Sequence, residues 1–249
     1  MPRFKLTIEY DGSNFAGWQR QPDNVETIQQ YIEEAIEKFA GKFCEVFAAG
    51  RTDAGVHATG QVVHCDIDKN VSDYNVLCGI NFYLLPVTEK IIVTKSERVA
   101  DDFHARFSAT GRAYLYRILN RHARPVLDNN RVWHIGGKPL NSDAMHQAAQ
   151  ILVGRHDFSS FINTDCQAPS KVKNVDRLDV IRVGDELKIY VEARSFLHNQ
   201  VRNMVGTLAM IGKGKWDKDK LHSILEAKDR TAAGQTAPAC GLYLTEVKY

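Results

Sequence analysis

The order of strand-like and helix-like segments repeats itself in the two halves of this chain. The segment RFKLTIEY alternates apolar and polar residues as a strand does. TIQQYIEEAIEKFAG then changes to helical spacing, with four apolar residues on one face: Ile28, Ile32, Ile36 and Phe39. Thr27 and Gln30 suit a capping box, and Gly41 suits a helix end. The strand-like FCEVFAA and GQVVHCDI, a helix near 72–83 and a strand near 89–98 follow, which predicts the order β-α-β-β-α-β.

The second half begins with the strand-like RAYLYRIL and reaches the helix SDAMHQAAQILVG through a long basic loop. Two strands near 171–182 and 186–193, the helix FLHNQVRNMVGTLAMIG, a helix near 217–227 and the strand GLYLTEV complete it. This order is β-α-β-β-α-α-β. We therefore expect an α+β fold of two ferredoxin-like units with antiparallel sheets, residues 1–104 and 105–249.

Composition excludes several classes of protein. Lys and Arg number 32 against 30 Asp and Glu, and no apolar run approaches the ~18 residues of a membrane span. The N-terminus reads as a strand and not as a signal peptide, so we expect a cytoplasmic protein. The five cysteines are odd in number and form no C-x-x-C pair, which favours free, mostly buried thiols: Cys44, Cys65, Cys78, Cys166 and Cys240.

Between residues 112 and 131 the chain is locally basic. One acidic residue, Asp128, stands among five arginines: Arg112, Arg117, Arg121, Arg124 and Arg131. Such a strip suits the phosphates of a nucleic acid. A solvated strand and loop face is the competing interpretation.

The loop AAGRTDAGVHATGQ, residues 48–61, concentrates chemistry between two glycines, Gly50 and Gly55. Glycine permits a ligand to approach the backbone closely, so Asp53 on this loop is a candidate reactive carboxylate. A hairpin loop whose aspartate caps its own backbone is the alternative. A metal site made of Asp53, His57 and His64 is less favoured, because no carboxylate pair or H-x-x-x-H pattern accompanies them.

GRTDAGVHATGQV resembles the active-site motif of the tRNA pseudouridine synthase A family. Four further segments resemble that family in the same order along nearly the whole chain: YDGSNFAGWQRQP, DDFHARFSATGRAYLYRI, FLHNQVRNMVGTL and APACGLYLTEVKY. The resemblance implies isomerisation of uridine to pseudouridine at positions 38, 39 and 40 of the tRNA anticodon stem-loop. It also implies a homodimer that needs neither a cofactor nor a metal.

The same resemblance implies roles for four residues. The catalytic aspartate falls on Asp53, the active-site tyrosine on Tyr114 and the arginine that pairs with the carboxylate on Arg202. Because Asp53 and Arg202 fall in different units, the resemblance also implies that the two sheets face a shared active-site cleft. Arg51 matches an arginine that helps to open the space left by the flipped base. His57 is expected to order the loop.

Each role has a structural alternative at the level of the sequence. Arg202 also suits a surface salt bridge, Tyr114 an inward-facing strand position like that of Tyr116, and Arg51 a phosphate contact without base flipping. Two aromatic residues near the first strand, Phe15 and Trp18, fit a core better than an RNA-stacking surface. A non-catalytic RNA-binding protein and a metal-dependent hydrolase are the alternative functions.

Overall fold

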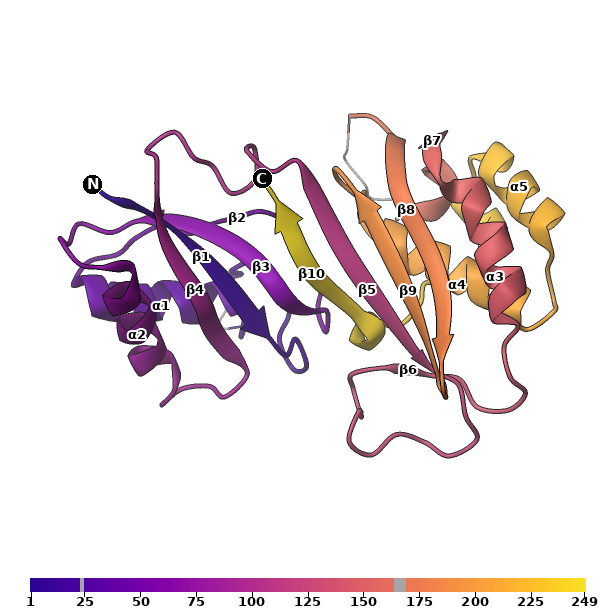
Figure 1. The fold of residues 1–249 in the computed structure, drawn as a ribbon, viewed down its shortest axis with the longest axis horizontal. Helices are drawn as coiled ribbons and strands as arrows, with labels where there is room; N and C mark the ends of the chain where they lie inside the picture. Colours follow the sequence, from indigo (N-terminus) through magenta and orange to yellow (C-terminus); the bar gives the residue numbers. More distant parts are fainter. Residues whose placement is uncertain (23–24, 164–168) are drawn as a thin grey trace. The chain divides into compact units, whose positions relative to one another are not determined.

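The computed structural model describes residues 1–22, 25–163 and 169–249. The chain forms two compact units (Figure 1), one made of Met1–Thr110 with Tyr243–Tyr249 and the other of Gly111–Leu242. This division differs from the expected 1–104 and 105–249 chiefly in the last strand. β10 (Leu242–Lys248) runs parallel to the start of β3 (His57–Asp66), with Tyr243 opposite His57, and therefore counts with the first unit.

The first unit has the strand order of a ferredoxin-like sheet. Its four N-terminal strands follow the order β4-β1-β3-β2 with every neighbouring pair antiparallel. Along β1 the side chains of Phe4, Leu6 and Ile8 are fully buried, as the period-2 pattern predicts. The remaining elements are β1 (Arg3–Tyr10), α1 (Ile28–Ala40), β2 (Phe47–Ala48), α2 (Asp73–Leu84) and β4 (Ile91–Val99).

Helix α1 begins and ends where its capping residues predict. The hydroxyl of Thr27 accepts from the backbone N–H of Gln30, and Gly41 adopts the left-handed conformation at the C-cap (φ 80°). The expected strand over FCEVFAA is reduced to the two residues of β2. Cys44 and Val46 are buried at alternate positions, as in a strand, but they lie outside the paired residues. Alternating burial alone cannot distinguish a paired strand from an extended segment that is not paired.

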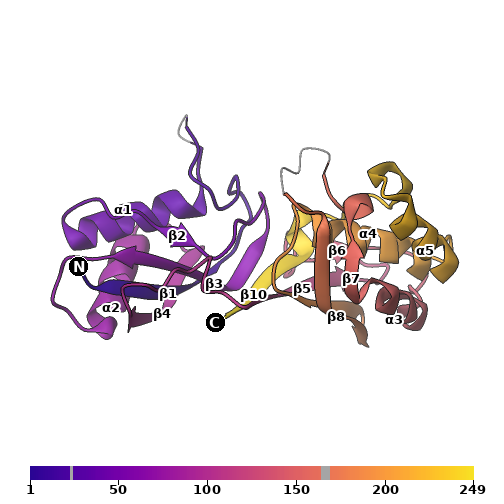
Figure 2. The same cartoon turned by 90° about the horizontal axis from the view of Figure 1, so that it is seen from above.

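The second unit contains a four-stranded antiparallel sheet in the order β5-β9-β8-β7, and the short β6 pairs with the end of β5. Helix α3 packs on α4, on α5 and against β8 (Figure 2). The strands are β5 (Gly111–Leu119), β6 (Trp133–His134), β7 (Gly154–Asp157), β8 (Val172–Val183) and β9 (Glu186–Ala193). The helices are α3 (Ser142–Ala149), α4 (Gln200–Gly212) and α5 (Lys218–Ala227).

Four of the five cysteines lie in the described residues, and all four are free thiols. Cys44 and Cys65 are buried, Cys240 is half-buried and Cys78 is exposed, while Cys166 lies outside the described residues. Within the described ranges, no helix combines the length and the apolar character that crossing a membrane requires.

Candidate active site

The loop that carries Asp53 connects β2 to β3 and is held by the segment that follows β1. The Tyr10 hydroxyl lies 2.7 Å from the Thr52 hydroxyl, and the backbone N–H of Trp18 donates to the Thr52 carbonyl oxygen (3.0 Å). The Val56 N–H closes the turn on the Asp53 carbonyl oxygen (3.1 Å). Asp53 is half-buried and Arg51 is exposed. The loop is therefore fixed on both sides of an aspartate that solvent still reaches.

Two glycines of YDGSNFAGWQRQP permit this close packing. A Cβ on Gly12 would lie 2.0 Å from the Val56 carbonyl oxygen. Gly17 has a φ of +98°, and a Cβ there would lie 2.8 Å from the Thr52 carbonyl oxygen. No side chain fits at either distance, so the backbone of this segment lies directly on the backbone of the Asp53 loop. The YDGSNFAGWQRQP segment thus positions the GRTDAGVHATGQV segment.

His57 orders the end of the loop, as expected. Its Nδ1 accepts from the backbone N–H of Gly12 (3.0 Å), and its ring stacks on Tyr243 of β10 with centroids 4.7 Å apart. His64 lies seven residues further along β3, about 23 Å away at the rise of a strand. One metal ion cannot bind both histidines. Within the described residues, no group of three or more His, Cys, Asp and Glu side chains is arranged to hold a metal ion.

The two tyrosines of β5 differ in burial, although the alternation of a strand places both on the same face. Tyr116 is fully buried, and its hydroxyl donates to the Pro238 carbonyl oxygen (2.7 Å). Burial raises its pKa well above the usual range. Tyr114 is half-buried and meets the edge of Phe196, with ring centroids 5.3 Å apart. Tyr116 is thus a core residue, whereas Tyr114 keeps part of its ring accessible.

Arg202 lies in the first turn of α4 and is half-buried. Its Nε donates to the Ala237 carbonyl oxygen (2.8 Å), and its Nη1 donates to Oδ1 of Asn199 (2.8 Å). The Ala237 N–H donates in turn to the Arg202 carbonyl oxygen (3.2 Å). These neutral acceptors fix the plane of the guanidinium, so the APAC segment positions this side chain as the YDG segment positions the Asp53 loop.

Sequence reasoning missed the residues that support Arg202. Asn199 precedes α4 in the left-handed conformation (φ 60°), and Arg230 lies in the stretch between α5 and the APAC segment. Nη2 of Arg230 donates to Oδ1 of Asn203 (3.1 Å) and to the Thr236 hydroxyl (3.0 Å), next to Ala237. Burial lowers the pKa of the Arg230 guanidinium. The only signal in the sequence was proximity to the two motifs, because hydrogen bonds to neutral groups leave no periodic pattern.

The arginines of the basic strip between residues 112 and 131 differ in their surroundings. Arg117 forms ion pairs with Glu186 (2.6 Å) and Asp128 (3.1 Å), and Arg112 donates to the Arg194 carbonyl oxygen (2.7 Å). Arg124 and Arg131 are exposed. Phosphate binding by the whole strip is therefore not expected, since Arg117 already faces two carboxylates.

Trp18 and Phe15 are buried, with exposed fractions of 2% and 7%. The core interpretation of these two residues is confirmed, so neither offers a stacking surface to RNA.

The molecule described so far is an α+β protein of ferredoxin-like units, with a reachable aspartate on a braced loop of one unit and an oriented arginine on a helix of the other. A family model described as tRNA pseudouridine synthase matches residues 6–108 and 148–249. The chain belongs to the tRNA pseudouridine synthase family and is accordingly an isomerase that acts on tRNA. The matched ranges contain Asp53 and Arg202, whereas Tyr114 lies between them.

Full-length relatives cover that gap. The chain is 54% identical over 249 residues to tRNA pseudouridine synthase A of Bartonella quintana (strain Toulouse), with 100% of both chains covered. It is 55% identical to tRNA pseudouridine synthase A of Rhodospirillum centenum (strain ATCC 51521 / SW), again with 100% of both covered. A solved chain titled "Crystal Structure of a Cbf5-Nop10-Gar1 Complex" matches with a TM-score of 0.36 and 10% identity, over 96% of this chain and 57% of that chain. This last similarity is too weak to support an inference.

Proposed function

We propose that this chain converts uridine to pseudouridine at positions 38, 39 and 40 of the tRNA anticodon stem-loop, with Asp53 as the catalytic carboxylate. The observation that carries the proposal is the bracing of the Asp53 loop, which leaves the aspartate half-buried. A loop held this rigidly can present one carboxylate at a fixed position, as positioned catalysis requires. Membership of the family and the relatives named tRNA pseudouridine synthase A support the same activity.

The reaction needs few groups because the substrate supplies most of them. The N1–C1′ bond breaks, uracil rotates within the site, C5 bonds to C1′, and the C5 proton is lost while N1 gains one. Ionised Asp53 either attacks C1′ to form a covalent sugar intermediate or removes the 2′ proton to form a glycal. No electron is gained or lost in either route, so the proposed reaction needs no redox cofactor. The proposal also includes no metal, because Asp53 and the substrate supply every group that the two routes use.

Arg202 is the proposed partner of the Asp53 carboxylate. A guanidinium beside the carboxylate favours its ionised form and orients it through paired N–H donors. Two donors of Arg202 are already held by Ala237 and Asn199, which sets the direction of the rest of the fork. Preorganisation of this kind lowers the cost of orienting the ion pair during the reaction.

Base flipping is the proposed means of access to the buried uridine. The accessible part of the Tyr114 ring would lie against the extruded uracil, and Phe196 holds the ring from its edge. Arg51 is exposed beside Asp53 and long enough to occupy the position that the base leaves. Contacts of this kind offset part of the few kcal/mol that unpairing costs.

The proposed assembly is a cytoplasmic homodimer. Helix α2 supports it, because this helix buries Val76, Ile80 and Leu84 and yet carries a second apolar face. That face, which we call the α2 stripe, has helical spacing and is exposed: Tyr74, Cys78, Phe82 and Leu85. Exposed apolar patches of this kind commonly mark protein interfaces.

Asp53→Asn tests the proposal most directly. The change keeps the shape of the side chain and removes the anion, so pseudouridine formation on an unmodified tRNA transcript should fall at least ~10³-fold while tRNA affinity stays within about twofold. Pseudouridine is mapped by position, in the presence of a chelator. Ready turnover by homogeneous Asp53→Asn protein would remove Asp53 from the chemistry. Loss of wild-type activity on chelation would instead favour a metal-dependent enzyme. Binding of tRNA by the wild-type protein without any turnover would favour a non-catalytic RNA-binding protein.

A further inference from the structure

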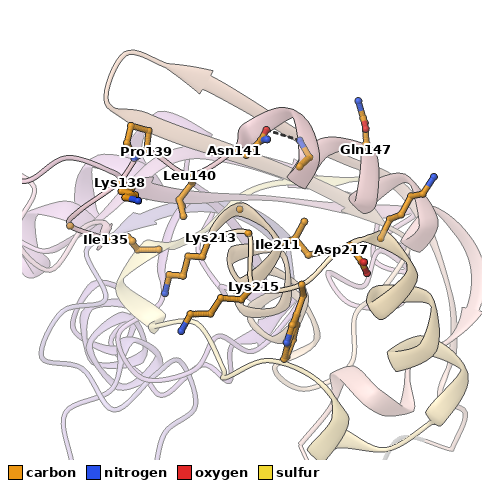
Figure 3. A pocket seen from close by; sticks show the side chains of 16 residues that line it. Ile135, Lys138, Pro139, Leu140, Asn141, Gln147, Ile211, Lys213, Lys215 and Asp217 are labelled. Atoms are coloured by element: carbon orange, nitrogen blue, oxygen red, sulfur yellow. Dashed lines mark hydrogen bonds between the residues drawn. The ribbon is translucent and has the colours of Figure 1, made fainter.

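A pocket of about 580 Å³ lies in the second unit, where the segment after β6, the start of α3 and the α4–α5 connection meet (Figure 3). Its lining includes the apolar residues Ile135, Pro139, Leu140 and Ile211. Ile135, Leu140 and Ile211 are themselves buried, and we call them the apolar floor of the pocket. None of the residues assigned above to catalysis lines this pocket.

The edge of the pocket is cationic. Four exposed lysines line it: Lys138, Lys213, Lys215 and Lys218. In Figure 3 the side chains of Lys213 and Lys215 extend in the same direction, toward the side where Ile135 and Lys138 lie. One carboxylate accompanies them, that of Asp217, and its Oδ1 accepts from the backbone N–H of Lys220 as the N-cap of α5 (2.8 Å). The local charge is therefore positive and suits phosphate groups.

Trp216 adds an aromatic surface to the lining. The two other tryptophans of the chain are core residues with exposed fractions of 2% (Trp18) and 9% (Trp133), whereas Trp216 is half-exposed. The Lys220 ammonium lies 6.0 Å from the indole centroid. An accessible indole among lysines combines the two features that bind unpaired nucleotides, a stacking surface for the base and cations for the backbone.

We propose that this pocket binds an unpaired nucleotide of the tRNA, with the base against Trp216 and the apolar floor and the flanking phosphates on the lysines. The identity of the RNA rests on the proposed function. Arg202 and Gly212 lie ten residues apart on α4, which corresponds to about 15 Å along the helix. The pocket is thus a second RNA-binding site of the same unit, separate from the side chain of Arg202.

Tryptophan fluorescence reports occupancy of this site directly, because Trp216 is the accessible indole of the three. Titration with unmodified tRNA transcript should quench the wild-type protein, and Trp216→Phe should lose most of that quenching while it still binds tRNA in a filter assay. Unquenched wild-type protein, or equal quenching in Trp216→Phe, would overturn the proposal. If a thermal scan shows that Trp216→Phe folds poorly, acrylamide quenching of the wild-type protein replaces this test. Bound tRNA should then protect the Trp216 indole from acrylamide, and absence of protection would contradict the proposal.

The lysines are tested by the double variant Lys213→Gln with Lys215→Gln. We expect several-fold weaker tRNA binding and a salt dependence reduced by about 1.4 in the slope of log K against log salt, as two lost phosphate contacts on a single strand predict. The matched control removes two ion-paired lysines of the first unit, Lys42→Gln with Lys95→Gln, and should leave both quantities unchanged.

Two results would refute the pocket as a nucleotide site. One is an unaltered salt slope in the Lys213 and Lys215 double variant. The other comes from competition experiments. If millimolar inorganic tripolyphosphate reverses the quenching caused by tRNA and short oligouridylate does not, the pocket is an anion site with no role for the base. Because the readout is binding, these outcomes are independent of whether Asp53→Asn abolishes turnover.

Discussion

Gly17 is the position at which one methyl group would disturb the Asp53 loop. Alanine there must adopt a φ of +98° and place its Cβ 2.8 Å from the Thr52 carbonyl oxygen. We expect Gly17→Ala to lower kcat for pseudouridine formation by about 10- to 100-fold, because displacement of a catalytic group by ~1 Å has effects of that size. The unfolding free energy should fall by about 1–2 kcal/mol, the cost of the left-handed backbone.

Gly41→Ala provides a matched control for this variant. Gly41 also has a positive φ (+80°), but a Cβ there meets nothing within 4 Å. Both variants should lose stability in chemical denaturation, Gly17→Ala at least as much as Gly41→Ala because its Cβ also meets the Thr52 carbonyl oxygen, and kcat should fall in Gly17→Ala alone. Equal activity in the two would show that the loop does not depend on this contact.

Arg202 permits a graded test of the proposed ion pair with Asp53. Lysine keeps the positive charge but loses the planar fork that donates to Ala237 and Asn199. We therefore expect the kcat order wild type, Arg202→Lys, Arg202→Ala, with tRNA affinity little changed. A residue that served a surface salt bridge would instead show kcat unchanged in both variants, which single-turnover kinetics would reveal.

At the scale of elements, β3 carries a histidine whose ionisation opposes folding. His64 is buried, and burial lowers its pKa to about 4, with smaller contributions from His104 and Arg3. Between about pH 6.5 and 4 the unfolded chain therefore binds a proton that the folded chain does not, so folding stability falls as the pH falls through this window. The contribution amounts to about 3 kcal/mol at most by pH 4.

His64→Gln should flatten that part of the stability profile, because glutamine keeps an acceptor for the Ala105 N–H and does not titrate. Urea unfolding at pH 7, 6, 5 and 4 measures the effect, and the exposed His122→Gln serves as control. A wild-type pH dependence in His64→Gln would assign the acid sensitivity to other groups.

The elements themselves were largely predictable from the sequence. Local signals defined α1, because its apolar spacing, Thr27 and Gly41 act within one helix, and alternation defined β1. Non-local pairing escaped the same reasoning: nothing within GLYLTEV indicates that this strand lies beside His57. The site divided likewise. A motif made Asp53 a candidate, whereas no sequence pattern indicated that Asn199 bonds to Arg202 or that Arg230, 27 residues further along the chain, bonds to Asn203 beside it.

At the scale of the whole molecule, the α2 stripe predicts how two copies associate. Phe82 and Leu85 have exposed fractions of 68% and 64%, and burial of both in a dimer would remove them from water. Phe82→Glu should convert the proposed dimer to monomer in light scattering coupled to gel filtration, since a carboxylate is costly to bury. Leu127→Glu changes a residue of the second unit that is 88% exposed and should leave the mass unchanged. A dimeric Phe82→Glu protein would place the interface elsewhere.

The position of β10 makes completion of the first unit depend on a segment that is synthesised after the whole second unit. Residues 1–110 leave the ribosome first, yet the residues that pair with the start of β3, and the ring on which His57 stacks, belong to Tyr243–Tyr249. In the same segment, the Tyr249 hydroxyl donates to the Ala105 carbonyl oxygen (2.8 Å). A nascent chain that stalls before Tyr243 therefore carries Asp53 on a loop whose neighbouring histidine still lacks its support. The first unit can therefore complete its fold only after residues 111–242, the whole of the second unit, have been synthesised.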